Sequence, residues 1–576
     1  MRTDFPFLVQ GQPPLEGHPN PYFEREDFLS LNGYWDFEMN QKKGPIPSYS
    51  QKILVPFAVE TEASGIQKPV KKGDVLHYRR TFVLPPSFLH RRVVLHFEAV
   101  DQVASVTLNG TLLGTHEGGY LPFSFDISPF LQEENVLEVE VEDDVESPIY
   151  PRGKQSKKGH GIWYTSTSGI YQTVWLEATP TEYLSSVKIT PLLERRSVRF
   201  EFEKQGSREI EIEIFFQGEP VACCSTTQEM VEVDLSPHFH SWSPEEPNLY
   251  SVEFRYGEDR VKSRFAMRQF GKIDYKGHSV FALNGKPYFL SGPLDQGYFP
   301  ESGLTPPSVE AMRFDLETMK SYGFNMVRKH IKVEPMQYYA MCDELGLIVM
   351  QDFVNGGGPY NLFLFALGTF LSPKWKDDKP GFIRSVGRGK SESRRFFEDQ
   401  FEEFALRFYN VPCVAVFTIF NEAWGQFETK KFVQKLRQID PTRLIDANSG
   451  WCDQGVGDFD SHHVYFRPVK LKESDGRILS LSEFGGYSHR VPGHAMSQKE
   501  FGYKRFRSQE ELQSAIATLY RDEIIPLLEK GLSVAVLTQY CDVEEEINGL
   551  LTYDRKAKKV DSSLLMDIHK ELRFHD

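Results

Sequence analysis

The sequence lacks the features that mark membrane proteins and nucleic-acid-binding proteins. No run of about eighteen consecutive apolar residues occurs, so neither a transmembrane helix nor a membrane partner is expected. The net charge is −15 and no basic run exceeds a few residues, although 154–158 is locally basic. Nucleic acid is therefore not an expected partner, because phosphate binding needs a concentrated Lys/Arg face.

Cysteine is also scarce, and its spacing fits no disulfide framework. Six Cys occur in 576 residues without a CxxC pair, and Cys223 and Cys224 are adjacent. The first residues, MRTDFPFLVQ, show no charged segment followed by an apolar one, as a signal peptide would. These observations favour a reducing, cytoplasmic location.

Metal-binding spacings are missing as well. No HExxH motif occurs, the one HxH spacing (His238-Phe239-His240) lies before the barrel region, and the adjacent His462 and His463 would point to opposite faces of a strand. No metal or other cofactor is therefore expected.

The first part of the chain, residues 1–178, reads as a β-sandwich. Short runs with period-2 alternation are broken by Gly, Pro and Asn, and Asn109-Gly110 between two such runs predicts a hairpin turn. The runs are VVLHFEAV (93–100), ASVTLNGTLLGTH (104–116), NVLEVEVED (135–143) and YQTVWLEA (171–178). Many short strands at this spacing are typical of a sandwich or jelly roll.

Residues 179–272 continue as strands without a convincing helix, which predicts a second, immunoglobulin-like sandwich. From about residue 280 the pattern changes, and apolar strand-like runs alternate with helical stretches such as 308–323 and 508–531. The eight runs are 288–292, 324–330, 345–353, 414–422, 443–449, 461–466, 478–484 and 534–540. This pattern predicts a (β/α)8 TIM barrel over 273–576, and the rival doubly wound sheet lacks a Gly-rich phosphate loop after its first strand.

The polar residues of these runs gather at the C-terminal ends, where barrel enzymes place their active sites. The candidates are Asp295, Arg328, His330, Asp352, Asn421, Glu422, Asn448, His463, Tyr465, Glu483, Gln539 and Tyr540. The N-terminal halves of the same runs are apolar.

Two carboxylates stand out in this set. Glu422 and Glu483 each end a hydrophobic run that should be buried, where a Glu is costly unless it is paired or functional. One such Glu has an ordinary explanation in a salt bridge to Arg328 or a helix cap, but two favour chemistry. Paired carboxylates across a sugar-sized cleft are what glycoside hydrolysis requires, one protonated and one ionised.

At this point a family resemblance is visible. FTIFNEAWGQF (417–427) resembles the acid/base strand of glycoside hydrolase family 2, and LSEFGGY (481–487) resembles its nucleophile strand. The similarity extends over essentially the whole chain through LNGYWDF (31–37), YRRTF (78–82), VTLNGTLLGTHEGGYLPFSFDIS (106–128) and GIWYTSTSGIYQTVWLE (161–177).

The resemblance implies a jelly-roll sugar-binding domain, an immunoglobulin-like domain and a catalytic barrel. It also implies a retaining exo-β-glycosidase in which Glu422 is the acid/base and Glu483 the nucleophile. Asn421 matches the residue that binds the sugar 2-hydroxyl, and Tyr465 falls where a tyrosine lies near the nucleophile. The remaining substrate-binding candidates, each also compatible with a scaffold role, are Asp295, Arg328, His330, Asp352, His463 and Tyr540. A carbohydrate is the expected partner, and a homo-oligomer is compatible because family members are often oligomers.

The glycone is less well defined. Family glucuronidases carry Asn-x-Lys before the Gly of a segment like GLLTYDRK (549–556), whereas this chain has Glu546, Ile547 and Asn548 there. Glucuronidase activity is therefore disfavoured. The segment 291–308 departs from the His-rich form of typical family galactosidases, which indicates a divergent branch. A β-galactoside is the first expectation because that activity is common in the family, with β-mannoside and α-arabinoside as alternatives.

Two other classes of function stay open. One is a carbohydrate-binding protein that has lost hydrolysis, and the other is a metal-dependent barrel hydrolase that uses Asp352 and His463. The long segment 355–390, which opens with Gly356-Gly357-Gly358 and carries Trp375, is expected to wall the aglycone side of the pocket.

Overall fold

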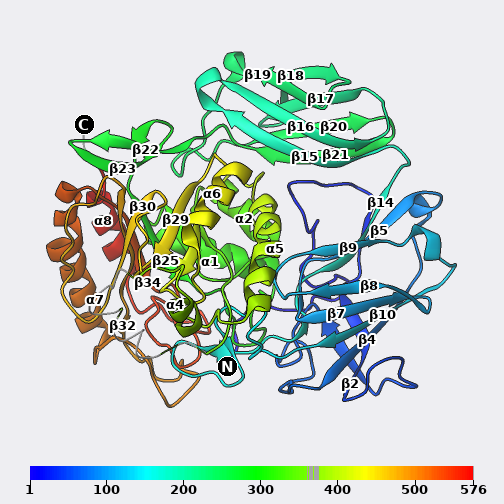
Figure 1. Cartoon of the computed structure of the whole chain (residues 1–576), viewed down its shortest axis with the longest axis horizontal. Helices are drawn as coiled ribbons and strands as arrows, with labels where there is room; N and C mark the ends of the chain where they lie inside the picture. The colour runs from blue at the N-terminus through cyan, green and yellow to red at the C-terminus, as the bar shows by residue number, and fades with distance from the viewer. Residues whose placement is uncertain (360, 362–367, 369–374, 575–576) are drawn as a thin grey trace.

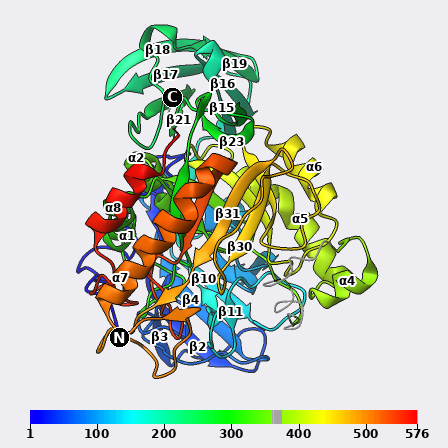
Figure 2. The same ribbon diagram turned by 90° about the vertical axis from the view of Figure 1, so that its left-hand side faces the viewer.

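The computed structural model describes residues 1–359, 361, 368 and 375–574, and shows two β-sandwiches beside a barrel (Figure 1). The first sandwich, blue to cyan, packs along one flank of the barrel. The second, cyan to green, lies across one end of the assembly, as the turned view in Figure 2 also shows. In the part of the chain that the structure describes, no helix is long and apolar enough to cross a membrane.

The first sandwich pairs a sheet of order β1-β14-β5-β9 with one of order β3-β2-β4-β10-β7-β8. Its main strands are β1 (Phe28–Ser30), β2 (Gly33–Asn40), β3 (Gln51–Val55), β4 (Val75–Phe82), β5 (Arg92–Phe97), β7 (Val103–Leu108), β8 (Thr111–Glu117), β9 (Phe123–Asp126), β10 (Asn135–Glu142) and β14 (Val174–Thr179). In β10 every second side chain is buried, because alternate residues of a strand face opposite sides of the sheet. The predicted turn at Asn109-Gly110 joins β7 to β8, and both residues adopt positive φ angles of 51° and 78°.

The second sandwich is built from sheets of order β15-β16-β19 and β18-β17-β20-β21. Its strands are β15 (Tyr183–Leu192), β16 (Ser197–Gln205), β17 (Ile210–Phe216), β18 (Glu219–Thr226), β19 (Met230–Asp234), β20 (Tyr250–Tyr256) and β21 (Asp259–Phe265). Phe200, Phe254 and Phe265 pack against one another inside it. A small antiparallel sheet of β22 (Phe270–Tyr275), β23 (His278–Leu283) and β24 (Lys286–Pro287) then leads into the barrel. The boundaries 1–178, 179–272 and 273–576 stay predictions.

Eight parallel strands form the barrel, as predicted, in the order β29-β28-β27-β26-β25-β34-β31-β30. They are β25 (Leu290–Asp295), β26 (Met326–Lys329), β27 (Ile348–Asp352), β28 (Val414–Asn421), β29 (Leu444–Ser449), β30 (Phe459–Val464), β31 (Ile478–Gly485) and β34 (Leu532–Thr538). Each predicted run overlaps one of them. The terminal strands of this order, β29 and β30, lie in contact, so the barrel is nearly closed.

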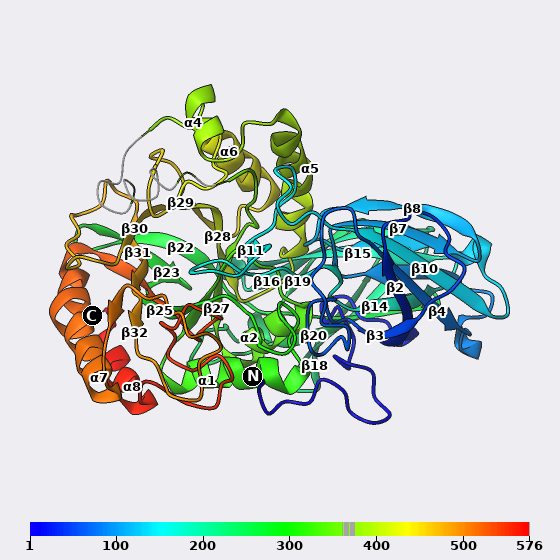
Figure 3. The same ribbon diagram turned by 90° about the horizontal axis from the view of Figure 1, so that it is seen from below.

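Helices cover the barrel unevenly. They are α1 (Val309–Ser321), α2 (Met336–Leu345), α4 (Pro380–Ser385), α5 (Ser391–Arg407), α6 (Thr429–Ile439), α7 (Gln509–Thr518) and α8 (Ser562–Glu571). The connections from β29 to β30 and from β30 to β31, both within the described residues, contain no helix. Near the carboxyl ends of β29 and β30, the rim of the barrel is therefore formed by loops (Figure 3).

Two helix predictions can be compared directly with the structure. Ser308 caps α1 by accepting a hydrogen bond from the Ala311 N–H, and the helix stops just before Gly323, whose φ is 84°. The predicted helix 508–531 is α-helical only to Thr518 and continues as a π turn and a 3₁₀ turn to Lys530. Pro526 explains the change, because proline has no N–H and clashes with the preceding turn.

Candidate active site

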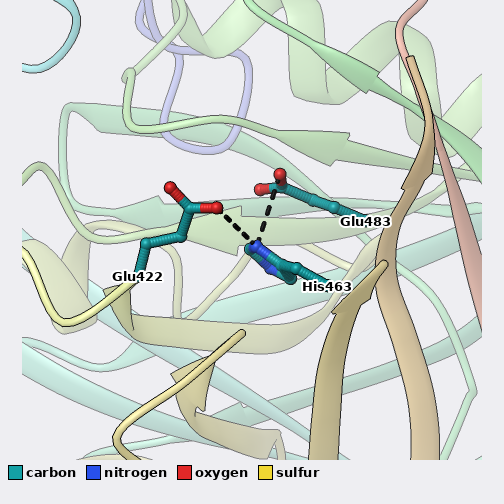
Figure 4. Close-up of side chains that lie close together, drawn as sticks. All are labelled: Glu422, His463 and Glu483. Carbon is teal, nitrogen blue, oxygen red and sulfur yellow. Dashed lines mark hydrogen bonds and ion pairs between the residues drawn. The ribbon is translucent and has the colours of Figure 1, made fainter. Parts of the chain in front are cut away.

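The barrel brings Glu422 and Glu483 together at its C-terminal face. Glu422 directly follows β28 and Glu483 lies near the end of β31, and every residue of both strands is buried. The two residues are 8% and 5% exposed. Figure 4 shows the two carboxylates facing one another, with dashed lines from both to the ring of His463 beside the gap, and one oxygen of each lies within 4.8 Å of the other.

Three groups stabilise the charge of Glu483. Arg328 Nη1 donates to Oε1 at 3.1 Å, the Tyr465 hydroxyl donates to Oε2, and His463 Nδ1 lies 3.4 Å from Oε2. Burial by itself raises the pKa of this carboxyl. The charges of His463 and Arg328, together with the Tyr465 hydrogen bond, outweigh burial, so the pKa of Glu483 lies below its ordinary value. Glu483 is therefore ionised at neutral pH, as a nucleophile must be.

Arg328 joins several of the predicted residues into one network. Its guanidinium, which is fully buried, donates to both oxygens of Asp352 at 3.1 and 3.0 Å and to Asn421 Oδ1 at 2.9 Å. His330 Nδ1 lies 2.9 Å from Asp352 Oδ2. Burial lowers the pKa of His330 to about 4, so this ring is neutral at physiological pH. Because Asn421 Oδ1 accepts from Arg328, the amide is held with its donor group, Nδ2, turned to the other side.

His463 links the two carboxylates to the neighbouring strands. Its Nδ1 lies 2.9 Å from Glu422 Oε1 and its Nε2 lies 2.9 Å from Ser449 Oγ. The preceding His462 pairs with Asp460 at 3.2 Å, and about a third of its side chain is exposed. The two adjacent rings therefore face opposite sides of β30, as the alternation of a strand requires.

Asp295 and Tyr540 have different partners. Asp295 Oδ2 accepts from Lys329 Nζ at 2.6 Å and from the Tyr338 hydroxyl at 3.2 Å. The Tyr540 hydroxyl donates to Asp315 of α1 at 3.0 Å. The hydrogen bonds of the described residues do not join either residue to the carboxylate pair, and their roles in binding substrate stay predictions.

The structure adds aromatic residues that the sequence analysis did not select. The ring of Tyr503 stacks on Tyr465 at 3.8 Å with an interplanar angle of 5°. Trp451, just after β29, meets the His463 ring edge-on at 5.9 Å, and Trp424 lies two residues after Glu422. Trp424 and Trp451 were visible as aromatic residues after barrel strands. Tyr503 had no comparable signal, because it lies in a long connection between β31 and α7.

The backbone at the acid/base candidate is unusual. Glu422 and Ala423 have φ angles of 51° and 60°, a left-handed conformation that non-glycine residues seldom adopt. The Glu422 N–H donates to the Ser449 carbonyl at 2.9 Å, which holds the turn in place. Such conformations cluster at functional sites, where the surrounding structure enforces them.

The part of the long segment 355–390 around Arg388 lies at this face of the barrel. Arg388 is fully buried, its Nε donates to the Gly425 carbonyl at 3.1 Å, and its guanidinium lies over Phe397. Residues 360, 362–367 and 369–374 of the segment lie outside the described residues. The expectation that the segment walls the aglycone side stays a prediction.

Within the described residues, one group has the composition of a metal site. Glu422, His463 and Glu483 offer ligand atoms within 4.8 Å of one another, and one nitrogen with two oxygens would suit Zn²⁺. However, Glu483 already accepts hydrogen bonds from Arg328 and Tyr465. A divalent cation there would lie beside the guanidinium charge, which disfavours a metal at this position.

Tyr465→Phe tests how the charge of Glu483 is maintained. Removal of the hydroxyl removes one hydrogen bond to the carboxylate, so the pKa of Glu483 should rise. We expect the acidic limb of the kcat/KM profile to move to higher pH and kcat/KM at its optimum to fall roughly 10- to 100-fold. A pH–rate profile of the two proteins checks this, and an unchanged acidic limb would show that Tyr465 does not act on Glu483.

Comparison with known proteins identifies two parts of the chain. Residues 51–180 match the glycosyl hydrolase 2 galactose-binding domain-like model, and residues 275–470 match the glycosyl hydrolases family 2 TIM barrel domain. Together the two matches cover more than half of the chain. The second match contains Glu422 and ends before Glu483.

Curated relatives are similar at low identity. A β-galactosidase of Thermoanaerobacter pseudethanolicus is 26% identical over 341 residues, which are 56% of this chain and 44% of that protein. A putative β-glucuronidase of Formosa agariphila is 26% identical over 396 residues, 66% of this chain and 34% of that protein. The matched regions thus span less than half of the length of these relatives.

Solved structures share the fold over almost the whole chain. The β-glucuronidase of Ruminococcus gnavus in complex with uronic isofagomine superposes with a TM-score of 0.76 at 17% identity, covering 97% of this chain and 100% of that one. A family 2 β-galacturonidase from Eisenbergiella tayi gives 0.71 at 18% identity, with coverages of 96% and 98%. The sandwiches, the barrel and the two family matches agree, and the chain belongs to glycoside hydrolase family 2.

Proposed function

We propose that this protein is a retaining, exo-acting β-glycosidase that works through a covalent glycosyl-enzyme. The observation that carries the proposal is the separation of the two carboxylates, whose nearest oxygens lie within 4.8 Å. Retaining enzymes hold their carboxyl groups about 5–5.5 Å apart, whereas inverting enzymes leave about 6.5–9.5 Å for a water molecule. The short separation favours direct attack by Glu483.

The reaction has two steps in this geometry. In the first, a Glu483 oxygen forms a bond to the anomeric carbon while the bond from that carbon to the leaving oxygen breaks, and Glu422 gives its proton to that oxygen. In the second, water forms a bond to the anomeric carbon, the bond to Glu483 breaks, and Glu422 takes the proton from water. Two inversions give overall retention.

The neighbouring residues support these steps. The Asn421 amide, whose oxygen accepts from Arg328, presents Nδ2 as a donor for the sugar 2-hydroxyl. His463 Nδ1 lies 2.9 Å from Glu422 and 3.4 Å from Glu483, so its ring contacts both groups that act in the two steps. Arg328 donates to both Asn421 and Glu483 and so holds them in place. Asp352, which His330 contacts, in turn fixes the Arg328 guanidinium.

For the glycone, we propose a β-galactoside first, with β-mannoside and α-arabinoside as alternatives. A β-galactosidase is among the similar curated proteins. The position that carries Lys in family glucuronidases is Asn548, which donates to Glu546 Oε1 at 3.0 Å and accepts from Gln539 at 2.7 Å. No cation stands at that position to pair with a uronate.

Release of p-nitrophenol from β-galactoside, β-glucuronide, β-mannoside, β-glucoside and α-arabinoside tests the activity and the glycone together. We expect selective release on one of these substrates, unchanged by prolonged treatment with EDTA. Loss of activity with EDTA and its return with Zn²⁺ would instead indicate a metal-dependent hydrolase. No release from any substrate, together with sugar binding by calorimetry, would indicate a binding protein.

A further inference from the structure

A loop of the first sandwich forms part of the catalytic face. The connection from β10 to β14 carries the short strands β11 (Gln155–Ser156) and β12 (Tyr164–Thr165) and reaches across to the barrel (Figure 3). The N–H groups of Arg152 and Gly153 both donate to the Asn355 carbonyl, at 3.1 and 3.0 Å, just beyond the end of β27. The backbone around residue 152 is therefore fixed against the barrel.

The acidic run 544–546 anchors the other side of this loop. Glu544 accepts from the Thr165 N–H at 2.8 Å, Glu545 accepts from the Gly161 N–H at 3.2 Å, and Glu546 accepts from the Tyr164 hydroxyl. These three carboxylates are thus engaged in holding the loop in place.

Two cations of the loop lie on aromatic rings instead of on carboxylates. The Arg152 guanidinium lies 5.5 Å from the ring centre of Trp163 and 5.7 Å from that of Trp424, and Lys154 Nζ lies 5.4 Å from the Trp163 ring. The two indoles meet edge-on at 5.2 Å. Among the described residues, no carboxylate forms an ion pair with Arg152 or Lys154, and Arg152 Nε and Trp424 Nε1 are buried without an acceptor.

The location of this cluster connects it to the reaction. Trp424 follows Glu422 by two residues, so the cluster lies beside the group that protonates the leaving oxygen. Other charges act on it only from a distance. Burial lowers the pKa of Arg152, and the charge of Glu146 partly counteracts this. Burial lowers the pKa of His330 to about 4 and raises the pKa of Glu546, and the charge of Lys154 lowers both pKa values to a smaller extent.

We propose that Arg152 and Lys154, with the Trp424 indole N–H, bind a carboxylate or sulfate group carried by the substrate. This inference rests on the proposed glycosidase function and names a substrate class for that same site, an acidic glycan. The Arg, Lys and Trp side chains are donors only, so they need a ligand rich in acceptors. Negative charge would neutralise the two cations, and the planar guanidinium suits two-point binding of carboxylate or sulfate.

The test compares substrates that differ only in charge. One pair changes the leaving group, 2-nitrophenyl against 4-carboxy-2-nitrophenyl β-galactoside. A second pair changes the glycone, 4-nitrophenyl β-galactoside against its 6-sulfate, and a third compares the β-glucoside with the β-glucuronide. For each pair, the anionic-to-neutral ratio of kcat/KM is measured in wild type and in the Arg152→Gln/Lys154→Met variant.

In at least one pair, we expect this ratio to fall about tenfold or more in the variant, the size of a lost charge-assisted hydrogen bond. The pair that responds shows whether the anion is on the leaving group or on the glycone. In wild type the ratio should also fall as salt is raised from 0.05 to 0.5 M, because salt screens the attraction between the two cations and an anionic substrate that approaches from solvent. Lys158→Met, which removes one exposed charge from the same loop, is the matched control and should leave the ratio unchanged.

Equal ratios in wild type and the double variant for all three pairs would overturn the inference. If no substrate is hydrolysed, the proposed activity fails separately. Calorimetric titration of both proteins with each of the same substrates then tests the binding cluster alone. Tighter binding of an anionic member by wild type and not by the variant supports the cluster, and equal binding refutes it.

Discussion

Glu483→Gln is expected to lose turnover on every glycoside, by roughly 10⁴-fold or more. The substitution keeps the shape of the side chain but removes the negative charge that attacks the anomeric carbon. The loss should be independent of leaving-group quality, because even an activated glycoside needs the nucleophile. Initial rates on the aryl glycoside panel, with protein at high concentration, measure it.

The matched control is Glu473→Gln, an exposed glutamate in the connection before β31, which should retain full activity. The smaller Glu483→Ala leaves space for an external anion. With azide it should form the α-glycosyl azide from a substrate with a good leaving group, because azide attacks from the face that Glu483 occupied. Activity within tenfold of wild type in Glu483→Gln would mean that another group is the nucleophile.

Glu422→Ala is expected to separate substrates by their leaving groups. Poor leaving groups should lose about 10²- to 10⁴-fold in kcat/KM, the usual contribution of general acid catalysis. Activated aryl glycosides such as the 2,4-dinitrophenyl derivative need little protonation and should be affected far less in the first step. Plots of log(kcat/KM) against leaving-group pKa should therefore be much steeper for the variant than for wild type.

Azide should restore turnover of the activated substrates by Glu422→Ala and should yield the β-glycosyl azide, because it intercepts the glycosyl-enzyme from the face that Glu422 occupies. This product is opposite in configuration to that from Glu483→Ala. Glu402→Ala, on the exposed part of α5, is the control for folding. Equal losses on good and poor leaving groups would show that Glu422 is not the acid.

Much of the fold could be predicted because its periodicity is regular. The alternation of apolar and polar residues in NVLEVEVE identifies β10, and the almost fully apolar VAVFTIF identifies β28 as a strand covered on both sides. The segment 508–531 was predicted as one continuous helix because its apolar spacing continues through Pro526. The α-helical hydrogen bonds cannot continue through a proline, and the α-helix ends at Thr518. Nothing in the local sequence predicted that loops without a helix would follow β29 and β30.

The site was partly predictable for a topological reason. All carboxyl ends of parallel barrel strands meet at one face, so polar residues that end different strands lie together. Arg328, Asp352, His463 and Glu483 could be identified for this reason from the sequence. It could not show that the Asp295 carboxylate is bound by Lys329, because such pairing depends on rotamers and on neighbouring loops.

Contributions from outside the barrel were harder to anticipate. In the sequence, Lys154 stood out only as part of the locally basic stretch 154–158, and nothing nearby placed that stretch against Trp424. The contact depends on how two domains pack, with Glu544 and Glu545 accepting from backbone N–H groups of the loop and Glu546 from the Tyr164 hydroxyl. The position of Tyr503, in the long connection between β31 and α7, could not be predicted either, because it also depends on contacts with residues distant in the sequence.

Covalent trapping tests the central claim most directly. The enzyme is incubated with the 2,4-dinitrophenyl 2-deoxy-2-fluoro-β-glycoside of the sugar that the panel selects, and is then analysed by intact mass and by peptide mapping. The two-carboxylate mechanism predicts a stoichiometric gain of one fluoroglycosyl unit on Glu483, with loss of activity in parallel. A label on another residue, or continued turnover of the parent glycoside without any mass gain, would contradict the assignment of Glu483 as nucleophile.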